Sequence, residues 1–177
     1  GRMVEPAELL GHIRLALARG GALSQVRVLV TAGGTQEPID PVRMITNRSS
    51  GKQGYALAQA ALDAGAEVTL IHAPTNLPTP TGAQEVLVHT AAEMMEAVLE
   101  AAGQCDIVLM AAAVADFRPA QIAAQKIKKG GGGLNLELEA TEDILMALAK
   151  VRKPGGLPRV VVGFAAESQE LEKNAAK

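Results

Sequence analysis

Glycine and hydroxyl side chains gather in one stretch of the sequence, residues 31–52. Gly33 and Gly34 stand near its start, and the run Ser49–Gly51 stands near its end. Paired glycines allow a backbone to approach an anion closely. The Ser-Ser-Gly run directly precedes a helical pattern, where free N–H groups and the helix dipole favour a phosphate. The residue types and their spacing therefore predict a phosphate-binding loop.

Neither of the two common phosphate-binding motifs fits this stretch. A P-loop needs a glycine where Thr46 stands and Ser or Thr where Gln53 stands. A dinucleotide fingerprint needs its glycines in one tight turn, and here an insertion separates Gly34 from Gly51 and Gly54. A plain glycine turn followed by an ordinary helix cap stays an alternative interpretation.

Two further segments carry side chains that could take part in chemistry. The run 111–115 is small enough for a flat ring to lie against its backbone, and Asp116 follows it. A carboxylate there suits Mg²⁺ that is also held by phosphate oxygens; the alternative is that Asp116 caps a turn and pairs with Arg118. Lys126 precedes a glycine run and is expected to swing over a polyphosphate. The alternative for residues 126–129 is a solvated basic loop.

Short apolar runs alternate with helical patterns around these segments. Strands are expected at residues 26–31, 67–72, 85–89, 106–111 and 159–167. Helices are expected at residues 6–19, 52–64, 91–102, after 141–143, and from 168 or 169 to 177. This alternation predicts a Rossmann-like, doubly wound α/β fold, with a mostly parallel sheet and helices on both faces. In such a sheet the segments 33–47, 111–118 and 163–167 share one edge and can converge.

Local signals add detail to this outline. Thr90 with Glu93 predicts a capping box at the start of the helix 91–102. The four glycines at 130–133 predict a flexible flap. Clean alternation of apolar and polar residues at 134–139 predicts a half-exposed antiparallel strand, which extends the parallel sheet.

Composition limits the class of protein. The 177 residues are 48% hydrophobic and 20% charged, which predicts one domain with a sizeable core. Only 2% are aromatic and the net charge is −2, so a base-stacking nucleic-acid surface is not expected. The single cysteine, Cys105, excludes an internal disulfide and is expected to be buried. His12, His72 and His89 lack metal-ligand spacing. No membrane span or secretory signal is recognised, so the expected location is the cytoplasm.

Five segments together resemble the phosphopantothenoylcysteine synthetase family, the second domain of bifunctional bacterial coenzyme A biosynthesis proteins. They are Thr31–Arg43, Thr46–Lys52, Ala112–Arg118, Lys126–Lys129 and Gly163–Glu167. The resemblance implies a nucleotide-binding synthetase domain at residues 25–177, truncated at its C-terminal end. It also implies that residues 1–24 are a linker and the tail of an upstream decarboxylase domain, to which FMN would belong.

The resemblance implies a ligase that joins 4′-phosphopantothenate to L-cysteine with CTP and Mg²⁺. An acyl-cytidylate forms first, and the products are 4′-phosphopantothenoylcysteine, CMP and pyrophosphate. The family's bacterial members are homodimers, and the strand at 134–139 is a candidate dimer element. Two alternatives remain open. An NAD(P)-dependent oxidoreductase would need an acidic residue after the strand that ends at His72, where Ala and Pro follow. A non-catalytic nucleotide-binding domain would not need Lys126.

The resemblance also implies roles for individual residues. Asn47 matches the asparagine that binds the acyl-cytidylate, and Lys126 matches the lysine that converts this intermediate. The implied nucleotide contacts are Gly33, Gly34, Ser49, Ser50, Gly51, Ala112, Ala113, Asp116, Lys126, Glu142, Asp143, Ile144, Leu145 and Phe164. The chain departs from the family pattern at Thr141 and Glu142, where Asn and Pro are usual.

Overall fold

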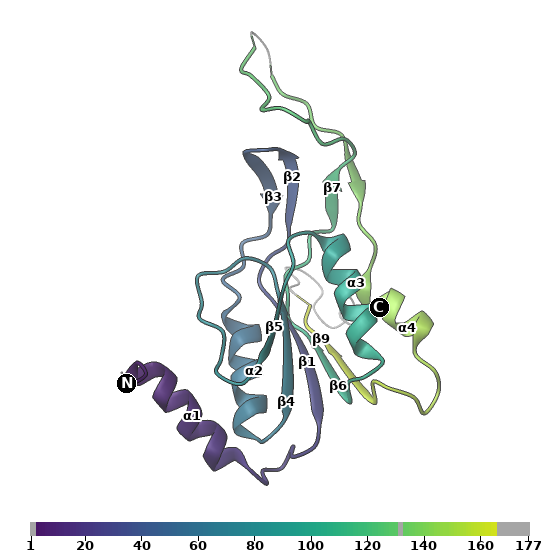
Figure 1. The fold of residues 1–177 in the computed structure, drawn as a ribbon. Helices are drawn as coiled ribbons and strands as arrows, with labels where there is room; N and C mark the ends of the chain where they lie inside the picture. The colour runs from purple at the N-terminus through teal and green to yellow at the C-terminus, as the bar shows by residue number, and fades with distance from the viewer. Residues whose placement is uncertain (1–2, 131–132, 166–177) are drawn as a thin grey trace.

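A five-stranded parallel sheet forms the centre of the computed structural model, which describes residues 3–130 and 133–165. The strand β1 (Arg27–Ala32) lies in the middle of the order β5-β4-β1-β6-β9, and every pairing in this sheet is parallel (Figure 1). The other four strands are β4 (Glu67–His72), β5 (Gln84–Leu87), β6 (Ile107–Met110) and β9 (Val160–Gly163). Counted along the chain, the order is 3-2-1-4-5, which confirms the doubly wound prediction.

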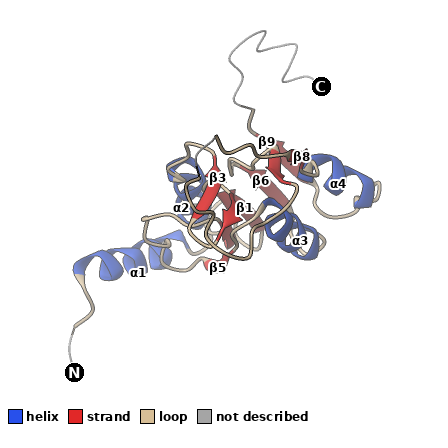
Figure 2. Ribbon diagram, turned by 90° about the horizontal axis from the view of Figure 1, so that it is seen from above, coloured by secondary structure: helices blue, strands red, loops and turns tan. Residues whose placement is uncertain are grey.

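Helices cover both faces of the sheet, as the alternating pattern predicted (Figure 2). On one face, α2 (Lys52–Asp63) packs against β1 and β4 and buries alanines together with Tyr55 and Leu62. On the other, α3 (Ala91–Ala102) buries Met94 and Val98, and α4 (Ile144–Val151) packs beside it. None of the helices in the two described ranges has the length and apolar character to span a membrane.

The predicted capping box at the start of α3 is confirmed. The Thr90 hydroxyl accepts from the backbone N–H of Glu93 at 3.2 Å, and the Glu93 carboxylate accepts from the N–H of Thr90. Glu37, which is only 2% exposed, accepts from the N–H of Ala91 at 2.8 Å. These carboxylates satisfy helix N–H groups that have no partner within the helix, so the start of α3 is fixed to the segment that follows β1.

Residues 31–52 do not form a plain loop, because they contain an antiparallel hairpin. Its strands are β2 (Gln36–Asp40) and β3 (Arg43–Thr46), and it projects beyond the carboxyl end of the sheet (Figure 1). A second antiparallel pair, β7 (Phe117–Pro119) with β8 (Leu138–Ala140), extends beside it. The β7–β8 pair corresponds to the predicted antiparallel extension, whereas the β2–β3 hairpin was not predicted.

Two expectations need correction. The strand predicted at 134–139 covers only 138–140, because its partner β7 is three residues long and ends at a proline. Strand β9 was expected to be buried, yet Val160 is 48% exposed, because β9 is the edge of the sheet within the described residues. The helix α1 (Pro6–Ala18) packs on α2, and Arg14 of α1 forms an ion pair with Asp63 of α2.

Other expectations are confirmed or fall outside the structure. Cys105 is buried, and this burial raises the pKa of its thiol. Such a thiol is a poor nucleophile, in agreement with a structural role. The predicted helix from 168 or 169 to 177 lies outside the described residues, as do the two central glycines of the predicted flap, so both stay predictions.

Candidate functional site

Glycines that are far apart in the sequence come together at the carboxyl end of β1. A Cβ atom on Gly51 would lie 3.4 Å from the backbone nitrogen of Gly33, and one on Gly34 would lie 3.4 Å from the Cβ of Ser49. Gly33 and Gly51 both have positive φ angles, +82° and +73°, which favour glycine. The two ends of the stretch therefore form a single cradle, and the β2–β3 hairpin is an insertion between them.

Gly54 completes this arrangement. A Cβ atom there would lie 2.5 Å from the Cβ of Ala32 and 2.7 Å from the carbonyl oxygen of Thr31, so only glycine allows α2 to approach β1 this closely. Close packing of helix on strand is the role of the third glycine in a dinucleotide fingerprint. The contiguous motif is absent from the sequence, yet Gly54 has the packing role of its third glycine.

The N-terminus of α2 faces the cradle without a side-chain cap. Gly51 occupies the N-cap position and has no side chain of its own to accept from the helix N–H groups. The hydroxyl of Ser49 accepts from the N–H of Gly51 at 3.3 Å, and that of Ser50 accepts from the N–H of Lys52 at 3.4 Å. N–H groups in the first turn of a helix that lack such a cap are suitable donors to an anion.

Two buried threonines fasten the Ala112–Asp116 segment to the end of β1. The hydroxyl of Thr31 accepts from the N–H of Ala112 at 3.1 Å, and that of Thr35 accepts from the N–H of Ala115 at 2.9 Å. Both threonines are 0% exposed. Ala113 also donates its N–H to the carbonyl of Gly33 at 2.7 Å. The predicted convergence of these two segments is confirmed.

The two threonines have no assigned role in the sequence prediction. They flank the Gly33–Gly34 pair and are polar residues in or beside an apolar strand. A buried hydroxyl needs a hydrogen-bond partner. Their position in the sequence therefore indicated that each binds another segment, although it could not identify which one.

Asn47 joins the hairpin to the same segment. Its side-chain amide donates to the carbonyl oxygens of Val114 at 3.0 Å and Ala113 at 3.4 Å. Its backbone carbonyl accepts from the N–H of Ser49 at 2.9 Å, so it also shapes the approach to the cradle. The Asn47 side chain is exposed and lies where the glycine cradle meets the alanine-rich segment.

Asp116 lies at the exposed end of the alanine-rich segment. Its backbone carbonyl accepts from the N–H of Thr141 at 2.9 Å, and the hydroxyl of Thr141 donates to the carbonyl of Ala115. Arg118 pairs with Glu139 at 2.8 Å, so the alternative pairing of Arg118 with Asp116 is wrong. Across residues 3–130 and 133–165, no three His, Cys, Asp or Glu side chains gather as a metal cluster.

The predicted contacts at 142–145 divide into two groups. The side chain of Asp143 caps α4 by accepting from the N–H of Met146 at 2.9 Å, and Ile144 is 4% exposed in the core. These two side chains are engaged away from the cradle. Glu142 and Leu145 are exposed, and Leu145 approaches the end of β9 at Gly163.

Phe164 follows β9 and is 46% exposed. Its N–H donates to the carbonyl of Met110 at 3.3 Å, which places its backbone beside the end of β6. Ala112 and Ala113 continue from β6, so the described part of the segment 163–165 lies at the same edge of the sheet.

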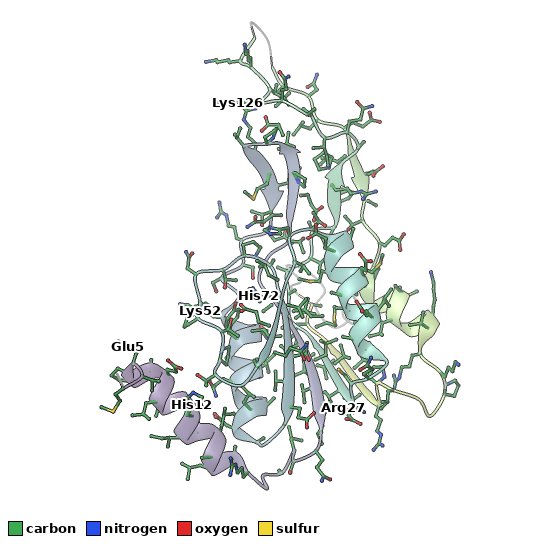
Figure 3. The ribbon with its side chains drawn as sticks, in the orientation of Figure 1. Glu5, His12, Arg27, Lys52, His72 and Lys126 are labelled. Carbon is green, nitrogen blue, oxygen red and sulfur yellow. The ribbon has the colours of Figure 1, made fainter. Side chains whose placement is uncertain are left out.

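Lys126 does not lie at the cradle in this structure. Figure 3 shows it beside the tip of the β2–β3 hairpin, well apart from Lys52 at the start of α2. Its neighbour Ile127 is hydrogen-bonded to Asp40 and Arg43 at that tip. The sequence prediction placed Lys126 within reach of the sheet edge and could not anticipate this attachment.

A series of contacts between polar side chains begins at the cradle and leads away from it. The methyl group of Thr75 lies against Gly33 and Gly51, and its hydroxyl donates to the hydroxyl of Tyr55 at 3.1 Å. The ring of Tyr55 meets that of His72 edge-on, and His72 contacts Glu85 at 2.7 Å. Hydrogen bonds from Thr79 and then His72 lower the pKa of Glu85, although burial opposes this.

Comparisons with known proteins show the family to which the chain belongs. A family model described as the DNA/pantothenate metabolism flavoprotein C-terminal domain matches residues 23–177. The coenzyme A biosynthesis bifunctional protein CoaBC of Mycobacterium bovis is 49% identical over 176 residues, which cover 95% of this chain and 42% of that protein. The chain therefore spans less than half the length of this curated relative.

Solved structures give the same result. The crystal structure of the C-terminal domain of a coenzyme A biosynthesis bifunctional protein CoaBC matches with a TM-score of 0.76 and 42% identity, over 88% of this chain and 72% of that one. A Cab2 mutant in complex with phosphopantothenate-cysteine matches with a TM-score of 0.68 and 18% identity, over 93% of this chain and 71% of that one. The second match shows a shared fold.

Proposed function

Because the chain belongs to the DNA/pantothenate metabolism flavoprotein C-terminal domain family, we propose that it is a ligase of coenzyme A biosynthesis that joins 4′-phosphopantothenate to L-cysteine. CTP is the proposed co-substrate. In the first step a carboxylate oxygen of phosphopantothenate attacks the α-phosphorus, and the bond to pyrophosphate breaks. In the second step the cysteine nitrogen attacks the acyl carbon, CMP leaves, and the amine gives up a proton to solvent.

The position of Asn47 is the observation that carries this proposal. Its amide lies between the phosphate cradle and the alanine-rich segment, and its two donor contacts reach Ala113 and Val114. A nucleotide with its phosphates at Gly33 and Gly51 and its base against Ala113 would place its α-phosphate near this amide. An acyl-cytidylate forms at that phosphate, so Asn47 is the proposed ligand of the intermediate.

The cradle supplies the electrostatic part of the proposed mechanism. Backbone N–H groups at Gly34 and at the start of α2 would face the charge that develops as pyrophosphate leaves. Donors fixed before the reaction stabilise such charge without reorganising. The buried threonines hold Ala112–Ala115 in register with the cradle, which keeps the two halves of the nucleotide site at a constant separation.

Asp116 is the proposed Mg²⁺ ligand. Mg²⁺ in nucleotide sites is usually held by one or two carboxylates together with phosphate oxygens and waters. The exposed carboxylate of Asp116, next to the proposed base site, fits this pattern. The bound ion would neutralise charge on the triphosphate.

Lys126 is proposed to act in the second step, on the intermediate. In this structure Lys126 lies at the hairpin tip, so this role needs either a displacement of the extension or the lysine of a second copy. The proposal also includes a homodimer. It also includes a cytoplasmic location and, since the relative is described as bifunctional, an FMN-binding decarboxylase domain joined through residues 1–24.

The test separates the two steps. Pyrophosphate release is measured with phosphopantothenate, Mg²⁺ and either CTP or ATP, and amide formation is then measured after L-cysteine is added. An Asn47→Ala variant is expected to lose about 100-fold or more in kcat, the usual cost of removing one donor to a transition-state charge. The matched control is Asn135→Ala, an exposed asparagine in the extension, which should retain full activity.

Two results would count against the proposal. Unchanged amide formation in Asn47→Ala would remove the role of that residue. Stabilisation of the chain by NADH but not by CTP would favour the oxidoreductase alternative, because only a ligand of the native state raises its stability.

A further inference from the structure

The tip of the β2–β3 hairpin is built around one shielded carboxylate. The side chain of Asp40 is 0% exposed and accepts four hydrogen bonds. One oxygen accepts from the backbone N–H groups of Val42 and Arg43, at 2.8 and 2.9 Å. The other accepts from the Arg43 guanidinium at 2.8 Å and from the N–H of Ile127 at 3.1 Å. The first two bonds suffice to close the turn, so the other two need a separate explanation.

Both charged side chains at the tip bind the same residue of another segment. Asp40 accepts from the N–H of Ile127, and the second nitrogen of the Arg43 guanidinium donates to the carbonyl oxygen of Ile127 at 3.1 Å. A third bond joins the N–H of Ala123 to the carbonyl of Ile39 at 3.0 Å. The hairpin thus holds residues 123–127 by three hydrogen bonds, and two of them converge on the residue that follows Lys126.

We propose that Asp40 is a positioning residue for Lys126. Together with Arg43 it clamps both peptide groups of Ile127, and it thereby fixes the backbone at Lys126 while leaving the lysine side chain exposed. The inference rests on the proposed function, since the importance of Lys126 comes from the role assigned to it in the second step. Lys129 follows the clamped peptide groups, so its backbone is not held by these two bonds.

The charge of Asp40 supports the clamp at neutral pH. Burial alone would raise the pKa of this carboxyl, but the N–H donors of Val42, Ile127 and Arg43 and the guanidinium charge together lower it. The groups that contact Asp40 come from the hairpin and from the segment 123–127. They are the backbone N–H donors and the guanidinium of Arg43. An ionised carboxylate accepts from all of them, whereas an amide of the same size has only one accepting atom.

Asp40→Asn is the variant that tests the clamp. The new NH₂ group of asparagine cannot accept a hydrogen bond. It has to face either the N–H groups of the turn or the N–H of Ile127, so the hydrogen bonds on one of these two sides are lost. The matched control is Glu139→Gln, which removes an exposed carboxylate that pairs with Arg118 in the same extension and does not contact Ile127. Arg43→Lys is a second variant, because it keeps the positive charge and removes the donor to the carbonyl of Ile127.

The first readout does not depend on activity. Amide hydrogen exchange at Ile127 and Ala123 is expected to rise about tenfold or more in Asp40→Asn, the effect of losing one charge-assisted hydrogen bond, and to rise less in Arg43→Lys. The Glu139→Gln variant should match the wild type. Unchanged exchange at Ile127 in both clamp variants would overturn the clamp.

The second readout links the clamp to the reaction. In Asp40→Asn, amide formation is expected to fall about tenfold through kcat, while pyrophosphate release without cysteine stays within about twofold. Raised exchange at Ile127 with unchanged amide formation would overturn the positioning role and leave the ligase proposal intact. Absence of pyrophosphate release in the wild-type protein would instead count against the proposed function. The clamp would then be tested by amide hydrogen exchange at Ile127 alone.

Discussion

Replacing Thr35 with valine tests how the site is held together. The two side chains have nearly the same shape, so the change removes the hydroxyl and little else. In the native structure this hydroxyl accepts from the N–H of Ala115 at 2.9 Å, and both residues are buried, at 0% and 4% exposed. The valine variant leaves that N–H without an acceptor inside the protein.

The magnitude follows from the lost partner. An unsatisfied buried donor costs about 1–3 kcal/mol. In a chain of 177 residues, a loss of about 2 kcal/mol in the free energy of unfolding lowers Tm by about 4–8 °C. Because the Ala112–Asp116 segment is then less firmly fixed to the cradle, the affinity for CTP is expected to fall by about tenfold, which corresponds to about 1.4 kcal/mol.

Thr35→Ser is the matched control. It keeps the hydroxyl and removes a buried methyl group, which costs about 0.8 kcal/mol of stability and should leave CTP affinity unchanged. Thermal and urea unfolding give the stability, and calorimetric titration gives the affinity. If the valine variant were as stable as the wild type and bound CTP equally well, the hydrogen bond from Ala115 would not be what holds the segment.

Three further predictions concern the cradle and the sheet. Gly54→Ala should lower stability by about 1–3 kcal/mol in urea unfolding, because the new Cβ would lie 2.7 Å from a backbone oxygen of β1. Gly51→Ala should cost about 1–2 kcal/mol of backbone strain at φ +73° and weaken CTP binding in a titration, whereas Gly103→Ala, with open space around it, should not. The backbone N–H and then the guanidinium of Arg27 lower the pKa of Asp106, so its contribution to stability is complete above about pH 4 and is lost as the pH falls further. Asp106→Asn should therefore flatten the acid side of a plot of unfolding midpoint against pH, and an unchanged slope would contradict this assignment.

Local signals in the sequence were sufficient for the central sheet and its helices. The strand 67–72 and the helix 91–102 have the predicted bounds. Their signals, an apolar run and a capping box, depend only on residues that are close together in the sequence. The hairpin between β1 and α2 was not predicted. One proline lies in β2 at position 38 and another in the turn at position 41, and β2 buries Glu37 and Asp40 against partners far along the chain. The exposure of β9 depends on strand order, which local patterns do not give.

The candidate site shows the same limit. The glycines near residues 33 and 51 were identified because their conformational role is intrinsic to the residue type. Thr35 was not, since its partner Ala115 is 80 residues away. The location of Lys126 was missed for a similar reason, because Ile127 is attached to Asp40 across 87 residues. Residue chemistry can be predicted from the sequence, whereas pairing across such separations depends on the complete fold.

The hairpin also affects the entropy of folding. Sixteen residues separate Gly34 from Gly51, and a flexible loop of that length would have to close before the cradle could form. The register from Gln36–Thr46 to Asp40–Arg43 closes most of this loop by local pairing, so only the few residues that flank the hairpin remain to be ordered. Each halving of a flexible loop saves about 0.6 kcal/mol of closure entropy. A long insertion between two halves of a binding motif is thus tolerated because it folds on itself.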